Sequence, residues 1–238
     1  MLGKKMSSLC TICVRSASKG VPGKNIRPIA GKPLLVHSID QAKASGLFEA
    51  VAVSSDGPEI LAVAERAGAD YRIRRPEELA GDNAPKLPAI RHCVESVERE
   101  TGHRFDVIVD LDATSPLRTV DDIVGAVSLL EKSSAENVIT GAKARRSPYF
   151  NLVELSEDGV VHLSKPLDSP VGRRQDAPRC FDMNASIYVW RRSALFEGDS
   201  LFGGSTRLFE MPEERSLDID SELDFQIVEF LLARNTEK

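Results

Sequence analysis

The chain has 238 residues, enough for one large α/β domain or two small ones, and 42% of them are hydrophobic, which supports a full core. Its formal net charge of −5 argues against a general electrostatic affinity for nucleic acid or an anionic membrane. No apolar run reaches the roughly 18 residues of a membrane span, and Arg15 follows too soon for a signal peptide, so we expect a cytoplasmic protein.

The chain begins with an apolar run at residues 9–14, which predicts a buried strand, followed by a basic loop at residues 15–25. Open α/β sheets bind ligands where their strands end. The loop carries three cations, Arg15, Lys19 and Lys24, and two glycines, Gly20 and Gly23. Cations neutralise an anion and glycines let the backbone approach it, so the loop predicts a polyphosphate site, with a solvated basic turn as the alternative. It is neither a Walker A loop nor a three-glycine dinucleotide fingerprint.

Strands and helices are then expected to alternate over the first 140 residues. Further strands are predicted at residues 51–54, 69–73, 107–111 and 137–140, and helices from about 32 to 45, at 58–67, at 87–101 and after Thr119. Thr119 is the expected N-cap, with Asp121 and Asp122 near the positive end of its helix. This alternation predicts a mainly parallel sheet with helices on both faces.

The pattern changes after residue 141. Residues 152–155 and 160–163 flank Ser-Glu-Asp-Gly, a hairpin signal, and a polar loop leads to an apolar strand at 185–190. We therefore expect a single domain over residues 1–238, with an arm at about 142–183 inserted for dimer contact. A last strand at 207–211 and a helix at 221–233, capped by Ser221 and Asp224, complete the domain.

Four cysteines raise the question of a metal or redox site. Cys10 and Cys13 have Cys-x-x-Cys spacing, but residues three apart on a strand point to opposite faces. Cys93 lies in a predicted helix and Cys180 in a loop, so no second pair completes a zinc set. Buried apolar cysteines are the prediction.

An Asp-x-Asp-x-Thr sequence ends the strand at 107–111. It is similar to the first motif of haloacid dehalogenase-type phosphatases, in which Asp110 would be the nucleophile and Asp112 the acid. Alternatively, residues 114–118 form a turn that lines a ligand pocket, with Arg118 or the backbone holding the ligand. An Asp-rich strand end with a proline turn is the purely structural interpretation.

A second acidic pair precedes the last helix. In an extended segment, Asp218 and Asp220 point to the same side. Two carboxylates so placed suit Mg²⁺, which completes its coordination with water and phosphate oxygens. A helix N-terminus decorated with acidic residues is the alternative.

A further polar cluster, Ser-Ser-Asp at residues 54–56, follows the second predicted strand. It is interpreted either as a helix cap or as a functional cluster.

In this order the clusters resemble the acylneuraminate cytidylyltransferases, or CMP-sialic acid synthetases, from about residue 11 to residue 229. Five blocks carry the resemblance: Arg15-x-x-Ser18-Lys19-Gly20-x-x-x-Lys24-Asn25, Arg75-Pro76-x-x-Leu79-Ala80-x-Asp82, Thr114-Ser115-Pro116-Leu117-Arg118, Arg174-Gln175-x-x-Pro178 with Asn184-x-x-Ile187-Tyr188, and Asp218-Ile219-Asp220. The family transfers CMP from CTP to a nine-carbon α-keto acid sugar and releases pyrophosphate. The resemblance implies a three-layer, Rossmann-like nucleotide-diphospho-sugar transferase fold with a β-hairpin dimerisation arm.

The resemblance also implies roles for individual residues. Catalysis would rest on Arg15, Lys24, Asp218 and Asp220, with the two aspartates binding Mg²⁺. The nucleotide would contact Arg15, Ser18, Lys19, Gly20, Lys24, Asn25, Arg75 and Asp82. The sugar would contact Asp112, Thr114, Ser115, Arg174, Gln175 and Tyr188. CTP and an α-keto acid sugar are the expected partners, and the arm of a second subunit in a homodimer would close the pocket.

Two departures from the family pattern lie near the expected sugar site. Asp112-Ala113 stands where sialic acid enzymes usually have Gln-Pro, and an acid would repel a sugar carboxylate but accept a hydrogen bond from a hydroxyl or amide N–H. Residues 148–151, Pro-Tyr-Phe-Asn, lack the Lys that often follows the arm's proline. These forms resemble the branch that activates legionaminic acid, so this acceptor is expected over N-acetylneuraminate. The alternatives are a phosphatase using Asp110 and Asp112, or a non-catalytic nucleotide-binding protein.

Overall fold

The structure, a computed structural model, describes residues 6–17, 20–81, 83–169 and 172–236. Its centre is a seven-stranded sheet in the order β11-β7-β10-β6-β1-β4-β5. The strands are β1 (Ser8–Cys13), β4 (Ala50–Ser55), β5 (Tyr71–Arg74), β6 (Val107–Leu111), β7 (Asn137–Lys143), β10 (Phe181–Arg191) and β11 (Thr206–Glu210). Only β10 runs antiparallel to its neighbours β6 and β7, so the predicted mainly parallel sheet is confirmed.

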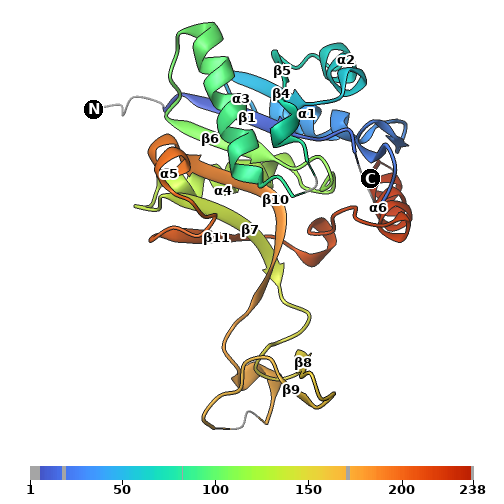
Figure 1. Cartoon of the computed structure of the whole chain (residues 1–238), viewed down its shortest axis with the longest axis vertical. Coiled ribbons are helices and arrows are strands. Elements are labelled where there is room, and N and C mark those ends of the chain that lie inside the picture. Colours follow the sequence, from blue (N-terminus) through green and yellow to red (C-terminus); the bar gives the residue numbers. More distant parts are fainter. Residues whose placement is uncertain (1–5, 18–19, 82, 170–171, 237–238) are drawn as a thin grey trace.

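The part of the chain that the structure describes contains six α-helices. They are α1 (Leu34–Ser45), α2 (Pro58–Arg66), α3 (Lys86–Thr101), α4 (Val120–Glu131), α5 (Arg192–Glu197) and α6 (Glu222–Thr236). Helices α1, α2 and α4 contribute buried side chains to one core cluster, and α3 and α5 to a second. The result is a three-layer α/β fold (Figure 1). None of the described helices combines the length and apolar character needed to cross a membrane.

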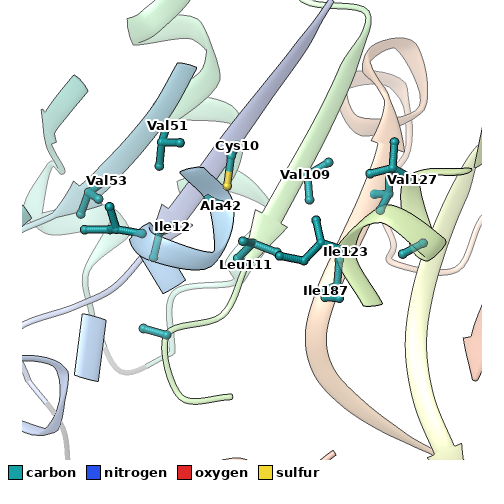
Figure 2. Close-up of a cluster of buried hydrophobic side chains, with 14 of the residues drawn as sticks. Cys10, Ile12, Ala42, Val51, Val53, Val109, Leu111, Ile123, Val127 and Ile187 are labelled. Atoms are coloured by element: carbon teal, nitrogen blue, oxygen red, sulfur yellow. The ribbon is translucent and has the colours of Figure 1, made fainter. Parts of the chain in front are cut away.

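The alternation of side chains along β1 divides its residues between the two cores. Cys10 and Ile12 pack with residues of β4, β6 and β10 beneath α1 and α4 (Figure 2). Leu9 and Cys13 instead face the cluster beneath α3. Cys10 and Cys13 therefore lie on opposite faces, as predicted, and all four cysteines are free thiols.

Local capping explains where several helices begin. Thr119 and Asp122 form the predicted capping box of α4, and Ser221 and Asp224 exchange the equivalent hydrogen bonds at the start of α6. Helix α1 begins at Leu34, slightly later than predicted, because β3 (Lys32–Pro33) first pairs with β2 (Pro28–Ile29). The remaining short elements are the 3₁₀ helices η1 (Lys24–Ile26), η2 (Glu77–Leu79), η3 (Arg174–Asp176) and η4 (Glu213–Arg215).

The segment between β7 and β10 projects from the body as an arm (Figure 1). It contains the predicted hairpin, formed by β8 (Val153–Leu155) and β9 (Val161–Leu163). Strand β10 begins before the predicted residue 185, because its first residues pair with β7 at the base of the arm. The register with β7 shifts between Met183 and Tyr188, around Ala185, whose φ is +52°.

Candidate active site

A cavity of about 420 Å³ lies where β1, β5 and β6 end. Parallel strands bring their carboxyl ends to one edge of a sheet, which is where α/β folds bind ligands. Its lining includes Arg15, Gly20, Lys24, Asn25, Arg75, Lys86, Asp112, Thr114, Asp218 and Asp220. The structure therefore brings together most of the predicted nucleotide and metal residues. Ser18, Lys19 and Asp82, which were also predicted, lie outside the described residues.

The basic loop after β1 is held in place by Asp56, which follows β4. Asp56 accepts hydrogen bonds from the Ser16 backbone N–H (2.8 Å) and the Ser16 hydroxyl. Burial opposes ionisation of Asp56, but these hydrogen bonds prevail and lower its pKa. Asn25 fixes the other end of the loop by donating to the Arg15 carbonyl (2.9 Å). Asp56 of the Ser-Ser-Asp cluster thus anchors the loop rather than capping the helix that follows.

The loop packs directly against the acidic segment that precedes α6. A Cβ added to Gly20 would lie 1.9 Å from the Asp220 carbonyl oxygen, so only glycine permits this approach. The Lys24 ammonium donates to the Ile219 carbonyl and lies 3.4 Å from a carboxylate oxygen of Asp220. Cations and carboxylates from opposite ends of the chain therefore share one wall of the cavity.

Several contacts position the acidic segment. The Ile219 side chain is fully buried, and its N–H donates to the Thr114 carbonyl (3.0 Å). Before it, Arg215 makes a bidentate pair with Asp122 of α4 at 2.8 and 2.9 Å. The segment is thus fixed on both sides of Asp218, and both aspartates line the cavity.

Asp218 and Asp220 could hold a divalent cation. Burial and the neighbouring negative charge of Asp220 raise the pKa of Asp218, as expected for a carboxylate lacking full compensation. Among the described residues, no group of three or more His, Cys, Asp or Glu side chains could enclose a metal ion. Two carboxylates facing a ligand cavity fit Mg²⁺, which usually completes its coordination with water and substrate phosphates.

Arg75 and several small apolar side chains also line the cavity. Arg75 is 6% exposed there, and its guanidinium donates to the Ser54 carbonyl (3.1 Å). Leu79, Ala84, Pro85 and Ala89 complete this part of the lining. The Asn25 Oδ1 atom is buried without a hydrogen-bond partner in the described structure. Small apolar side chains with a few fixed polar groups suit a flat, polar ring.

Asp112 is joined in the cavity lining by Lys86, which sequence reasoning missed. Lys86 is the first residue of α3, and its ammonium lies 2.9 Å from Asp112 and 3.1 Å from Asp110. Burial opposes ionisation of Asp112, but Lys86 and hydrogen bonds from Thr114 lower its pKa to about 2. A lysine directly after Pro85 was the available signal, but its carboxylate partners lie about 25 residues away in the sequence.

Arg118 does not hold a ligand, and this part of the prediction is wrong. Its side chain is 2% exposed and donates to the backbone carbonyls of Ser186 (2.9 Å) and Asp112 (2.8 Å), as well as to the Ser38 hydroxyl. Burial lowers its pKa to about 10. Because its guanidinium donates hydrogen bonds to these backbone carbonyls, Arg118 stabilises the turn after β6.

Four predicted sugar residues are not part of the lining of this cavity within a single chain. Ser115 and Tyr188 are buried. The Tyr188 ring stacks on Trp190, and the Lys86 ammonium lies 4.5 Å from the centre of the Tyr188 ring. Arg174 and Gln175 line a second cavity of about 850 Å³ at the base of the arm. The structure brings Asp112 and Thr114 together but separates them from the two arm residues.

Asp110 is unsuited to the role of a phosphatase nucleophile. Its side chain is fully buried and outside the lining of the cavity, and it accepts a hydrogen bond from Thr11 (2.8 Å). A nucleophile must reach the atom that it attacks. The Asp-x-Asp-x-Thr sequence therefore supplies a buried ion-pair partner and a residue of the cavity wall.

Comparisons with known proteins agree with this arrangement. A family model described as cytidylyltransferase matches residues 9–202. The chain is 46% identical over 225 residues to CMP-N,N'-diacetyllegionaminic acid synthase of Campylobacter jejuni, and 45% identical over 224 residues to post-translational flagellin modification protein B of Campylobacter coli. Each alignment covers 94% of both proteins. CMP:2-keto-3-deoxy-manno-octonic acid synthetase complexed with CTP has the same fold, with a TM-score of 0.70 and 18% identity over 96% of this chain and 99% of that one.

Proposed function

The chain belongs to the cytidylyltransferase family, and we propose that it transfers CMP from CTP to the anomeric hydroxyl of an N,N'-diacetyllegionaminate-type nonulosonic acid, releasing pyrophosphate. The chain is a CTP-utilising nucleotidyltransferase. The 46% identity to a CMP-N,N'-diacetyllegionaminic acid synthase over nearly the whole of both chains carries the choice of acceptor.

The basic loop is the proposed site of the triphosphate. Attack of the hydroxyl oxygen on the α-phosphorus forms one P–O bond while the bond to the leaving pyrophosphate breaks. Charge on the transferred and leaving phosphates must be neutralised, and Arg15 and Lys24 provide cations in the cavity lining. Asn25 and Arg75 are proposed to hold the cytidine. The chain's main task is to keep these partners in register.

Asp218 and Asp220 are the proposed Mg²⁺ ligands. When bound, Mg²⁺ would act as a Lewis acid that neutralises phosphate oxygens. The chain contributes two carboxylates fixed by the buried Ile219 between them and by contact with Gly20. The raised pKa of Asp218 supports this proposal, because it indicates that the negative charge of the pair is not fully neutralised by the chain itself.

The sugar is proposed to bind beside Asp112 and Thr114, with the arm of a second copy completing the pocket. Apolar side chains are exposed along the arm, including Val153 (54%), Leu155 (70%) and Val161 (59%). An isolated two-stranded hairpin is at best marginally stable in water, so such a surface needs a partner. A homodimer would cover it and would allow Arg174 and Gln175 to serve the partner's cavity.

Pyrophosphate release with a panel of sugars tests the proposed function. Purified protein is given CTP and Mg²⁺ with diacetyllegionaminate, pseudaminate, N-acetylneuraminate or 3-deoxy-manno-octulosonate. Release is expected to require CTP, Mg²⁺ and one sugar together, with the highest kcat/KM for diacetyllegionaminate. ATP and UTP in place of CTP are the matched nucleotide controls.

Two results would overturn parts of the proposal. A higher kcat/KM with N-acetylneuraminate than with diacetyllegionaminate would reject the acceptor, but leave the transferase activity standing. Release that continues without any sugar would indicate hydrolysis of CTP and would reject the transfer reaction itself.

A further inference from the structure

Lys86 lines the cavity but pairs with two carboxylates of its own chain. Its ammonium lies between the carboxylates of Asp110 and Asp112, at 3.1 and 2.9 Å, and 4.5 Å from the centre of the Tyr188 ring. The Lys86 side chain is 27% exposed, whereas that of Asp110 is fully buried. The family's nucleotide and metal roles described above do not use this cluster.

The Asp112 carboxylate is held at both of its oxygens. One oxygen accepts from the N–H and hydroxyl of Thr114, at 3.1 and 3.0 Å, and the other accepts from Lys86. The backbone carbonyl of Asp112 accepts in turn from the buried Arg118 guanidinium (2.8 Å). A carboxylate oxygen has about two lone-pair sites, so the oxygen facing Lys86 can accept one more hydrogen bond. Asp112 lines the cavity, and that remaining site is available to a ligand there.

The charges show what the cluster presents to a ligand. The Lys86 ammonium pairs with two carboxyl groups, those of Asp110 and Asp112, so its charge is already compensated within the cluster. Asp110 is sealed beneath the surface, with a hydrogen bond from Thr11 (2.8 Å). The group that faces the cavity is therefore the Asp112 carboxylate, an acceptor of hydrogen bonds and a poor partner for phosphates.

We infer that Lys86 is a positioning residue for the acceptor sugar, which fixes the Asp112 carboxylate against the cavity wall to accept a hydrogen bond from an amide N–H or hydroxyl of that sugar. This inference rests on the proposed function. A hydrogen bond to a charged acceptor is stronger than one between neutral groups. A site built to receive a donor rejects analogues without it, because the site's own polar group is then left unpaired.

Asp110 provides the means to test Lys86 without leaving an uncompensated buried charge. Lys86→Met alone would strand the buried Asp110 carboxylate, which is costly for folding. Asp110→Asn removes that charge and leaves the Lys86–Asp112 pair in place. The informative comparison is therefore Asp110→Asn with Asp110→Asn/Lys86→Met, and Asp110→Asn/Lys86→Arg serves as the conservative replacement. Thermal unfolding verifies that all three variants fold.

The readout is the KM for each substrate, measured by pyrophosphate release with the other substrate saturating. Relative to Asp110→Asn, the Lys86→Met double variant should raise the KM for diacetyllegionaminate about tenfold or more, which corresponds to one strong hydrogen bond. Its KM for CTP should change less than about twofold, and Lys86→Arg should restore much of the sugar affinity because a guanidinium also pairs with a carboxylate.

Each other result counts against the inference. An equal or larger increase in the KM for CTP would assign Lys86 to the nucleotide. Unchanged sugar KM in the Lys86→Met double variant would show that Asp112 needs no such support. Failure of the wild-type protein to use any sugar in the panel would overturn the proposed function and this inference with it, whereas unequal KM effects among active variants concern Lys86 alone.

Discussion

Asp218 combines half-burial, a raised pKa and a neighbouring carboxylate, and this is the local chemistry expected where a cation is required. Replacing it with Asn removes a negatively charged oxygen but keeps the size of the side chain. We predict that Asp218→Asn lowers kcat by at least about a hundredfold, roughly 3 kcal/mol of transition-state stabilisation. Stability should not fall, because repulsion from Asp220 is relieved. Pyrophosphate release and thermal unfolding measure the two effects.

Glu222→Gln is the matched control for Asp218→Asn. Glu222 lies four residues further along, is exposed and pairs with Arg27 (2.7 Å), away from the cavity. Its replacement should leave kcat within about twofold, since solvent screens an exposed ion pair and the pair does not touch the cavity. An Asp218→Asn variant with more than a third of wild-type kcat would show that Asp218 is not needed for the reaction.

Gly20 offers a test of the contact between the basic loop and the acidic segment. In Gly20→Ala the new Cβ would have to displace the Asp220 carbonyl, 1.9 Å away, so one of the two segments must move. We predict at least a tenfold loss of kcat/KM, because misplacing catalytic groups by about 1 Å is costly. Gly204→Ala, whose Cβ meets nothing within 4 Å, should retain wild-type kinetics. Equal kinetics for both variants would mean that the contact is dispensable.

Residue-level reasoning picked out several side chains that line the cavity, and the roles assigned to them stay predictions. This reasoning identified Arg15, Gly20 and Lys24 of the basic loop and the Asp218/Asp220 pair, all of which line the cavity, whereas Gly23 lies outside the lining. It failed for Arg118 and Lys86, because the partners of a long cationic side chain depend on tertiary contacts. Arg118 donates hydrogen bonds to backbone carbonyls, and Lys86 forms ion pairs with two carboxylates, one on β6 and one in the turn after it. Charge alone does not distinguish a ligand-binding cation from one already compensated.

The pair between Asp122 of α4 and Arg215 of η4 connects a helix to the segment that carries the acidic residues. Burial raises the pKa of Asp122, but hydrogen bonds from Arg215 and Thr119 outweigh this effect and lower it overall. The ionised carboxylate therefore stabilises the folded state above its unfolded pKa of about 4, and this contribution is lost as pH falls through the lower folded value.

We predict that Asp122→Asn lowers the free energy of unfolding by about 2 kcal/mol at pH 7, the usual range for a lost charged hydrogen bond. The difference from wild type should be smaller at about pH 3.5, below the unfolded pKa, because the stabilisation is lost as pH falls from the unfolded towards the lower folded pKa. Urea unfolding at the two pH values measures it, and Asp121→Asn, an exposed neighbour, is the control. A difference that is constant with pH would assign the effect to packing rather than to charge.

At the scale of elements, periodicity and caps located most strands and helices, since these signals are local. The capping residue Thr119 and the glycines after α1 and α3 marked helix ends correctly. The beginning of β10 and the short helix α5 were not predicted. The first residues of β10 are strand only because β7 pairs with them, and the short α5 has few residues from which a period could emerge.

The alternation of strands and helices was sufficient to predict the layers of the whole molecule, because a parallel sheet must be covered on both faces. The sequence could not predict that β10 lies between β6 and β7, antiparallel to both. Such an order depends on long-range pairing rather than on local pattern. The same limit applies to the arm, whose hairpin is locally encoded but whose proposed contact with a second copy of the chain is not.

The arm carries the last prediction, which concerns a second copy of the chain. The Val161 side chain is 59% exposed on β9, so placing Lys there should not disturb the core of its own chain. If the arm packs on another subunit, Val161→Lys buries a charge in that contact, which is costly without a partner. We predict that the wild type sediments as a dimer and that the variant shifts towards monomer. The variant should also have an increased KM for the sugar, whereas its thermal midpoint at low protein concentration should be unchanged. Val124→Lys, at a 38% exposed valine of α4 on the body, should remain dimeric.

Two results would contradict this prediction. If Val161→Lys stays dimeric with wild-type kinetics, the arm is needed neither for assembly nor for sugar binding. If the wild type is a fully active monomer, the cavity of one chain performs the transfer alone.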